Sequence, residues 1–176
     1  RKDCVNCYIL DVDGTLIDSS GVYLPALQQM LDEYGYAHTP EMLKTAFGMT
    51  GRQGLRYFGI PEAQHDEFMH RWESLAYENL LNVKIYDGIL DTLHALREGG
   101  SKLGIVTSRT RAQFRDGVKP PGLDRYFDTV VCSDEVAHPK PAPDAALECL
   151  QRPGCAAGPA VHIGASGVAM TGAGAA

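Results

Sequence analysis

The sequence predicts an α/β fold, with a Rossmann-like three-layer core, a mostly parallel sheet and an inserted α-helical domain. Two observations lead to this prediction. In the second half of the chain, short apolar runs alternate with helical segments, a pattern typical of a parallel sheet covered on both faces. A stretch with only helical periodicity, from about residue 19 to residue 84, separates the first apolar run from the others.

The first part of the chain predicts one strand and then helices. The strand is the apolar run 7–10, followed by Asp-Val-Asp-Gly-Thr-Leu. A helix ending at Gly35 carries apolar residues on one face, namely Leu24, Leu27, Leu31 and Tyr34. The glycines at 48, 51 and 54 indicate a flexible loop. A second amphipathic helix carries Phe68, Trp72, Leu75 and Ala76, and we assign both apolar faces to the core.

From about residue 87, helices and strands alternate. Ile89, Leu93 and Leu96 indicate a helix that the Gly-Gly pair at 99–100 ends. Strands are expected at 102–106, 129–132 and 160–163, and helices beginning near Arg109 and Pro143. We therefore expect residues 1–18 and 85–176 to form the α/β core, and residues 19–84 to form the helical insertion.

Composition limits the classes of function. The hydrophobic fraction of 44% and the charged fraction of 22% are typical of a soluble globular protein. A net charge of −6 without a basic stripe argues against a general nucleic-acid binder. No stretch approaches the roughly 20 apolar residues of a membrane span, and no signal peptide is evident. We expect a cytoplasmic protein, monomeric or a small homo-oligomer, that binds neither nucleic acid nor membranes.

The five cysteines favour a reducing compartment, because their number is odd and they are scattered. Cys4 and Cys7 form a C-x-x-C pair. The pair runs into a strand instead of opening a helix, as a redox motif would, and no second pair with zinc-ligand spacing follows. We therefore expect ordinary thiols near a strand.

Polar residues follow the predicted strands at their carboxyl ends, where open α/β sheets bind ligands. Asp11 and Asp13 follow the first strand, and Thr107 and Ser108 follow the second. Lys140 lies in a proline-rich loop after the third. A turn at the next glycine, residue 14, allows both carboxylates to face one pocket.

These side chains suit phosphoryl transfer. A carboxylate can attack phosphorus, because the acyl phosphate that forms is readily hydrolysed. A second carboxyl group can protonate the leaving oxygen and then deprotonate water. The hydroxyls of Thr107 and Ser108, with N–H groups at a helix start, would hold the phosphoryl group, and Lys140 would neutralise its charge. Arg109 is a further candidate for a residue at the pocket rim. Arg52, in the glycine-rich stretch 48–55, is a candidate for contact with a carboxylate or phosphate of the substrate.

Other interpretations fit less well. An EF-hand calcium loop beginning at Asp11 would need an acidic residue at Val22 and a glycine at Leu16. A lone Thr-Ser is only a helix cap, and a lone Lys-Pro only a turn. All three patterns, in this order and each at a strand end, favour a catalytic site.

These motifs are similar to motifs one to three of the haloacid dehalogenase-like superfamily: Asp-Val-Asp-Gly-Thr-Leu at 11–16, Thr-Ser at 107–108 and Lys-Pro-Ala-Pro-Asp at 140–144. The resemblance implies that Asp11 is the nucleophile and Asp13 the general acid and base. It implies that the Asp11 carboxylate and the Asp13 backbone carbonyl hold Mg²⁺, and that the inserted helices form a mobile cap. The residues expected to bind phosphate or substrate are Gly14, Thr107, Ser108, Arg109 and Arg52.

The resemblance implies a magnesium-dependent phosphatase acting on a small phosphorylated metabolite through an aspartyl-phosphate. Asp13 disfavours dehalogenation, because true dehalogenases lack the second aspartate. The motifs look most like those of phosphoglycolate phosphatase-like hydrolases. Two alternatives stay open: a β-phosphoglucomutase-like phosphotransferase, and a non-catalytic binder of a phosphorylated ligand.

The expected fourth motif, Gly-Asp-Ser with a second aspartate four residues on, is altered. Ala165 and Ala169 stand where the two aspartates belong, and Ala165 occupies the position of the expected third metal ligand. Either this is a weak or inactive relative, or the alanines do not represent the natural residues. The second explanation fits the tail, because residues 153–176 contain 14 Ala or Gly in 24 and no Asp, Glu, Lys or Arg. Relatives continue through another strand and helix, so we expect the core to be incomplete at its C-terminal end.

Overall fold

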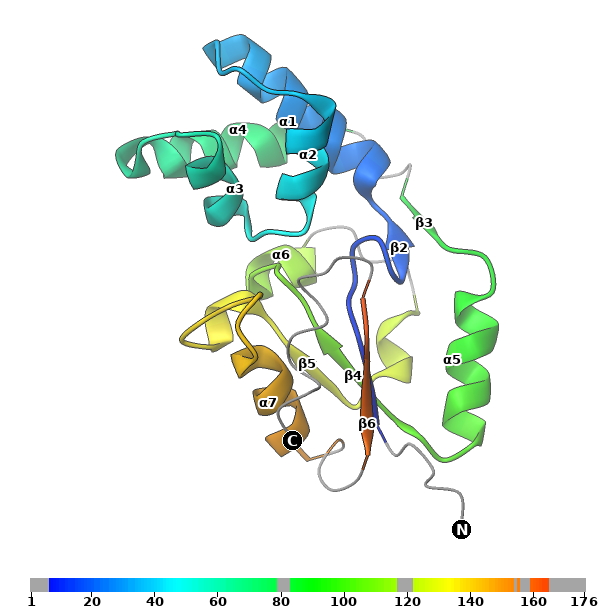
Figure 1. The fold of residues 1–176 in the computed structure, drawn as a ribbon. Helices are drawn as coiled ribbons and strands as arrows, with labels where there is room; N and C mark the ends of the chain where they lie inside the picture. The colour runs from blue at the N-terminus through cyan, green and yellow to red at the C-terminus, as the bar shows by residue number, and fades with distance from the viewer. Residues whose placement is uncertain (1–6, 79–82, 117–121, 154, 156–158, 165–176) are drawn as a thin grey trace. The chain divides into compact units, whose positions relative to one another are not determined.

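The structure is a computed structural model that describes residues 7–78, 83–116, 122–153, 155 and 159–164 (Figure 1). The chain divides into two compact units. One comprises residues 1–18 and 84–176, and the other comprises residues 19–83. The first boundary, after residue 18, is the same as in the division expected from the sequence, and the second lies one residue earlier than expected.

The first unit is built on a four-stranded parallel sheet with strand order β5-β4-β1-β6. Its strands are β1 (Cys7–Leu10), β4 (Lys102–Val106), β5 (Thr129–Val131) and β6 (Ala160–Ile163). All four lie where the apolar runs predict them. The strands β1, β4 and β5 are mostly buried, which explains why they read as continuous apolar segments.

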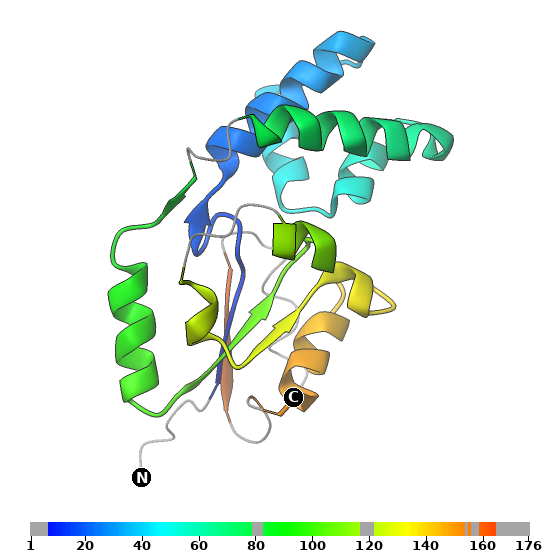
Figure 2. The same ribbon diagram turned by 180° about the vertical axis from the view of Figure 1, so that it is seen from behind.

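Helices cover both faces of this sheet. They are α5 (Ile89–Glu98), α6 (Arg111–Asp116) and α7 (Asp144–Gln151), with 3-10 turns at Asp124–Tyr126 and Ser133–Glu135. Both ribbon views show α5 and α7 on opposite sides of the sheet (Figures 1 and 2). The face near α7 has a buried cluster of Cys7, Ile9, Val106, Val131, Ala145, Cys149 and Cys155. The predicted fold class is therefore confirmed.

The strand order determines where a ligand can bind. The chain moves outward from β1 to β4 and β5, then returns to β6 on the other side of β1. The order thus reverses beside β1, and open α/β sheets bind ligands at the carboxyl ends of strands flanking such a reversal. The segment that begins at Asp11 leaves the sheet at this point.

A second, two-stranded sheet was not predicted. It pairs β2 (Ile17–Asp18) with β3 (Lys84–Ile85) in antiparallel register. These strands are the segments that leave for the helical unit and return from it. Each strand has only two residues, so neither produces a detectable alternation of apolar and polar side chains.

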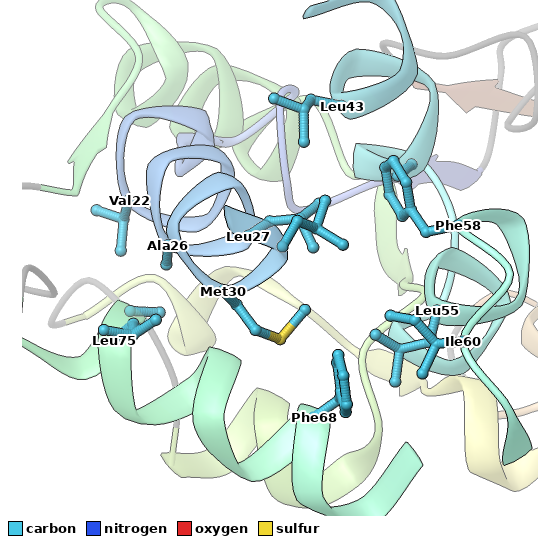
Figure 3. Packing of buried hydrophobic residues seen from close by; sticks show 13 residues of the cluster. Val22, Ala26, Leu27, Met30, Leu43, Leu55, Phe58, Ile60, Phe68 and Leu75 are labelled. Atoms are coloured by element: carbon cyan, nitrogen blue, oxygen red, sulfur yellow. The ribbon is translucent and has the colours of Figure 1, made fainter. Parts of the chain in front are cut away.

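The helical unit contains α1 (Ser20–Tyr34), α2 (Pro40–Phe47), α3 (Gly51–Tyr57), a 3-10 turn (Glu62–Gln64) and α4 (His65–Tyr77). As predicted, α1 ends at Gly35, whose φ of 75° is left-handed. Side chains from all four helices and from the segment after α3 form one apolar core (Figure 3). None of the helices in the described ranges is long and apolar enough to cross a membrane.

The expectation of a flexible loop across the glycines at 48, 51 and 54 is wrong, because α3 occupies most of it. The Thr50 side chain accepts a hydrogen bond from the Gln53 backbone, and the Gln53 side chain accepts one from the Thr50 backbone. This reciprocal capping box starts a helix that the glycines disguise. Glycine at position 51 also allows the Met69 side chain to pack closely against α3, because a Cβ there would lie 2.6 Å from that side chain.

The expectation of ordinary thiols is wrong for Cys7, which forms a disulfide with Cys155. Their Cα atoms are 5.4 Å apart and their positions 148 residues apart in the sequence. No local spacing predicts a partner so distant. The other described cysteines, Cys132 and Cys149, are buried free thiols.

Candidate active site

Asp11 lies directly beyond β1, at the carboxyl edge of the sheet. Its backbone N–H donates to the Ile163 carbonyl at 3.0 Å, so hydrogen bonding with β6 continues up to this residue. Its side chain is almost buried, and Oδ1 accepts from the Val12 N–H at 2.8 Å. The sheet and this short hydrogen bond fix the orientation of the carboxylate.

Lys140 is the cation beside that carboxylate. Its Nζ lies 2.9 Å from Asp11 Oδ1 and donates to the Val106 carbonyl at 3.2 Å. Only 5% of the residue is exposed. The lysine thus joins the ends of β1 and β4, and the structure brings together two residues that the sequence motifs placed in one site.

Burial has the largest effect on the pKa of the Asp11 carboxyl group. Loss of hydration raises the pKa of the Asp11 carboxyl, the charge and hydrogen bond of Lys140 lower it, and the neighbouring Asp13 raises it again. The pKa of Asp11 is raised overall. A nucleophile must be ionised, so the site depends on Lys140 to limit this rise.

Asp13 projects from the turn after β1. Gly14 has a φ of 78°, and its N–H donates to the Ile17 carbonyl at 2.9 Å, so the predicted turn is present. The Asp13 carboxylate pairs with the Arg109 guanidinium through two parallel bonds, Nε to Oδ2 at 2.8 Å and Nη2 to Oδ1 at 2.6 Å. Sequence reasoning placed Arg109 at the pocket rim and missed this pairing, which joins positions 96 residues apart.

Thr107 and Ser108 follow β4, as predicted. Thr107 is buried, its N–H donates to the Val131 carbonyl at 3.1 Å, and its hydroxyl accepts from the Arg109 N–H at 3.2 Å. The next helix, α6, begins at Arg111, two residues after the expected start near Arg109. Thr107 therefore shapes the loop between strand and helix.

Three further residues of the predicted site lie either in the helical unit or outside the described residues. Arg52 belongs to α3 in the helical unit, where its exposed guanidinium pairs with Asp66 of α4. Ala165 and Ala169, at the altered fourth motif, lie outside the described residues.

The described part of the chain contains no cluster of three or more His, Cys, Asp or Glu side chains arranged to hold a metal ion. The Asp11 carboxylate and the Asp13 backbone carbonyl are hard oxygen donors that suit Mg²⁺. Magnesium commonly uses one or two carboxylates, with water and substrate oxygens completing its shell. The residues present are thus compatible with a magnesium ion that keeps several waters.

Comparison with known proteins identifies the family. The family model of the haloacid dehalogenase-like hydrolases matches residues 8–176 of this chain. A pyrophosphatase, PpaX of Bacillus velezensis, is 32% identical over 164 residues, covering 91% of this chain and 74% of the relative. This chain belongs to the haloacid dehalogenase-like hydrolase family.

Solved structures agree with this assignment. A proposed haloacid dehalogenase-like hydrolase from Bacteroides fragilis matches with a TM-score of 0.85 and 27% identity, covering 98% of this chain and 84% of that one. A proposed phosphoglycolate phosphatase from Lactobacillus plantarum matches with a TM-score of 0.83 and 25% identity. The match covers 96% of this chain and 81% of that one. The chain is thus a hydrolase of the phosphatase type within this family, as its motifs predicted.

Proposed function

We propose that this haloacid dehalogenase-like hydrolase cleaves small phosphomonoesters through an aspartyl-phosphate on Asp11. One observation carries the proposal: a buried carboxylate lies 2.9 Å from a buried ammonium group at the ligand-binding edge of the sheet. Negative charge develops on the phosphoryl oxygens during transfer, and a fixed cation in a site of low polarity stabilises it strongly.

In the first proposed step, an Asp11 carboxylate oxygen attacks phosphorus. The bond from phosphorus to the leaving oxygen breaks, and that oxygen takes a proton from Asp13. Lys140 offsets the charge on the phosphoryl group. The products of this step are the free alcohol and the acyl phosphate on Asp11.

In the second proposed step, water attacks the same phosphorus while Asp13 accepts a proton from it. The bond from phosphorus to the Asp11 oxygen breaks, which releases inorganic phosphate and restores the carboxylate. Asp13 has then given one proton and regained one.

Magnesium belongs to the proposal as a cofactor held by the Asp11 carboxylate and the Asp13 carbonyl. When bound, it would neutralise phosphoryl charge and favour the ionised form of Asp11. Within this proposal, residues 19–83 serve as the cap that selects the substrate, because the core residues engage only the phosphoryl group.

The relatives suggest which substrates to test. The PpaX relative is named a pyrophosphatase, so inorganic pyrophosphate is a second candidate substrate, with an acid anhydride in place of an ester. The Lactobacillus plantarum structure makes 2-phosphoglycolate a natural member of the ester panel. Both substrates pass through the same phosphoenzyme.

The test is phosphate release from pyrophosphate and a panel of phosphomonoesters, with and without Mg²⁺. We expect metal-dependent release by the wild-type chain and a loss of about a thousandfold or more in Asp11→Asn. Acid-quenched enzyme should carry a phosphoryl group that hydroxylamine removes, as expected for an acyl phosphate. The intact mass of the sample should first establish the residues at 165 and 169.

Other outcomes favour the alternatives. Transfer of the phosphoryl group to a second sugar phosphate, exceeding release to water, would identify a phosphotransferase. Binding of phosphorylated ligands without turnover, in a sample with alanine verified at both positions, would favour a non-catalytic binder. Equal turnover by wild type and Asp11→Asn would contradict the aspartyl-phosphate mechanism.

A further inference from the structure

We infer that Arg109 is a positioning residue that orients the Asp13 carboxyl group for proton transfer, and that it does not bind the phosphoryl group of the substrate. The inference rests on the proposed function, because it assigns Asp13 the role of general acid and base. It differs from the sequence-based expectation, in which Arg109 contacts the substrate.

The first argument is the geometry of the pair. Two donors of the guanidinium, Nε and Nη2, each meet a different oxygen of the Asp13 carboxylate, at 2.8 and 2.6 Å. A single contact would leave the carboxylate free to rotate about its χ2 bond. Two parallel bonds fix both its position and the plane of its oxygens.

The second argument is the anchoring of Arg109 itself. Its N–H donates to the Thr107 hydroxyl at 3.2 Å, and its carbonyl accepts from the Ser133 N–H at 2.9 Å. The side chain is only 8% exposed. The segments after β4 and β5 thus hold the arginine in place, as a support for another side chain requires.

The third argument is that Asp13 needs such support. It follows the sheet on a turn whose glycine has positive φ, and its side chain is 20% exposed. Asp11, in contrast, is held by β6 and by Lys140. Each carboxylate of the motif is therefore paired with a buried cation: Asp11, the nucleophile, with Lys140, and Asp13, the proton-transfer group, with Arg109.

The experiment compares two substrates that differ in their need for an acid. The leaving group of an alkyl ester such as glycerol phosphate must be protonated as it departs, whereas p-nitrophenolate leaves without a proton. The value of kcat/KM reports the steps through formation of the phosphoenzyme. We therefore measure the ratio of kcat/KM for glycerol phosphate to that for p-nitrophenyl phosphate in wild type, Arg109→Gln and Arg109→Lys.

We expect the ratio to fall by about 10- to 100-fold in Arg109→Gln, because misplacing a catalytic group by about 1 Å can reduce the rate by that factor. Lysine cannot form the two-point contact, so Arg109→Lys should restore the ratio only in part. In an Asp13→Asn background, Arg109→Gln should lower the ratio no further. Arg111→Gln is the control, because Arg111 pairs with Glu135 instead of Asp13.

Three results would overturn the inference. An equal loss on both substrates with a raised KM would make Arg109 a phosphate-binding residue. An equal loss with a lowered melting temperature would give it a purely structural role. Full restoration by lysine would show that charge alone suffices. Failure of the proposed function is distinguishable, because the wild type would then turn over neither substrate, or Asp11→Asn would retain turnover.

Discussion

The two units of the molecule differ in how deeply they bury their charged side chains. In the α/β unit, Asp11, Lys140 and Arg109 are buried polar residues, and their ion pairs lie at the edge of the sheet. Among the described residues of the helical unit, ion pairs such as Arg52 with Asp66 leave at least one partner substantially exposed, and the buried core is mostly apolar. Buried charge is expensive to maintain, so its concentration in one unit marks the part of the chain where chemistry is favoured over stability.

The largest effect that would test this contrast is expected from Lys140→Met. Removing the ammonium group leaves the buried Asp11 carboxylate without its cation, which further raises the pKa of Asp11. We expect the free energy of unfolding to fall by about 3–5 kcal/mol and turnover by about 10²- to 10³-fold. Urea denaturation and steady-state kinetics measure the two quantities.

Lys102→Met is the control for that variant. Lys102 belongs to the same unit, but its side chain is 53% exposed and its Nζ lies 3.6 Å from Asp128. Its loss should change stability by about 0.5 kcal/mol or less. If the two variants behave alike, burial of the Asp11 pair has no special consequence and the contrast between the units fails.

In the helical unit, the corresponding large effect should come from an apolar side chain. Phe68 is fully buried on α4, among residues of α1 and α3 (Figure 3). We expect Phe68→Ala to lower the stability of this unit by about 3–5 kcal/mol, because the truncation loses buried apolar area and leaves a cavity. Trp72, the only tryptophan, reports unfolding of this unit by fluorescence.

Tyr77→Ala provides the comparison, since Tyr77 is on the same helix and 72% exposed. This substitution should be close to neutral. A Phe68→Ala protein that unfolds at the wild-type urea concentration would show that the apolar cluster does not hold the unit together.

The sequence predicted the α/β elements well, because buried parallel strands and amphipathic helices have local signatures. The strands at 7–10, 102–106 and 160–163 have the predicted bounds. Prediction from the sequence failed where an element is very short or where its composition suggests another structure. The glycines of α3 suggested a loop, although the Thr50 capping box starts a helix. The two-residue strands β2 and β3 were too short to recognise.

The candidate site shows the same limit. Motif order at strand ends brought Asp11 and Lys140 together, because parallel strands place their carboxyl ends at one edge. It did not predict which cation pairs with Asp13. Arg109 was matched to the substrate, yet in the structure it pairs with Asp13, and Cys7 pairs with Cys155. Such pairings depend on three-dimensional register, which one sequence does not reveal.

A smaller effect should appear in the pH dependence of stability. Within the described part of the chain, neither ring nitrogen of His162, on β6, has a hydrogen-bond partner. Burial, assisted by the charge of Lys140, lowers the pKa of His162 to about 4. The unfolded chain therefore binds a proton near the ordinary value of about 6.5, before the folded chain does. The contribution of His162 to the free energy of unfolding should be fully present above about pH 6.5. It should decrease as the pH falls toward 4.

His162→Leu should remove that part of the decline, measured by urea denaturation at several pH values. His94→Leu is the matched control, because the His94 side chain is 65% exposed and paired with Glu98 on α5. The control should keep the wild-type pH dependence. Parallel curves for all three proteins would show that His162 is not held neutral by the α/β unit.

The smallest effect is expected at Arg52, where stability and substrate binding can be separated. Arg52→Ala and Asp66→Ala each break the same exposed ion pair, so each should change stability by about 0.5 kcal/mol or less. If Arg52 also exchanges this contact for an anionic group of the substrate, KM should rise in Arg52→Ala and not in Asp66→Ala. We expect this difference, because the partners are 55% and 88% exposed and their bond is open to competition. Equal KM values would confine Arg52 to the surface of the helical unit and leave substrate selection to other residues of that unit.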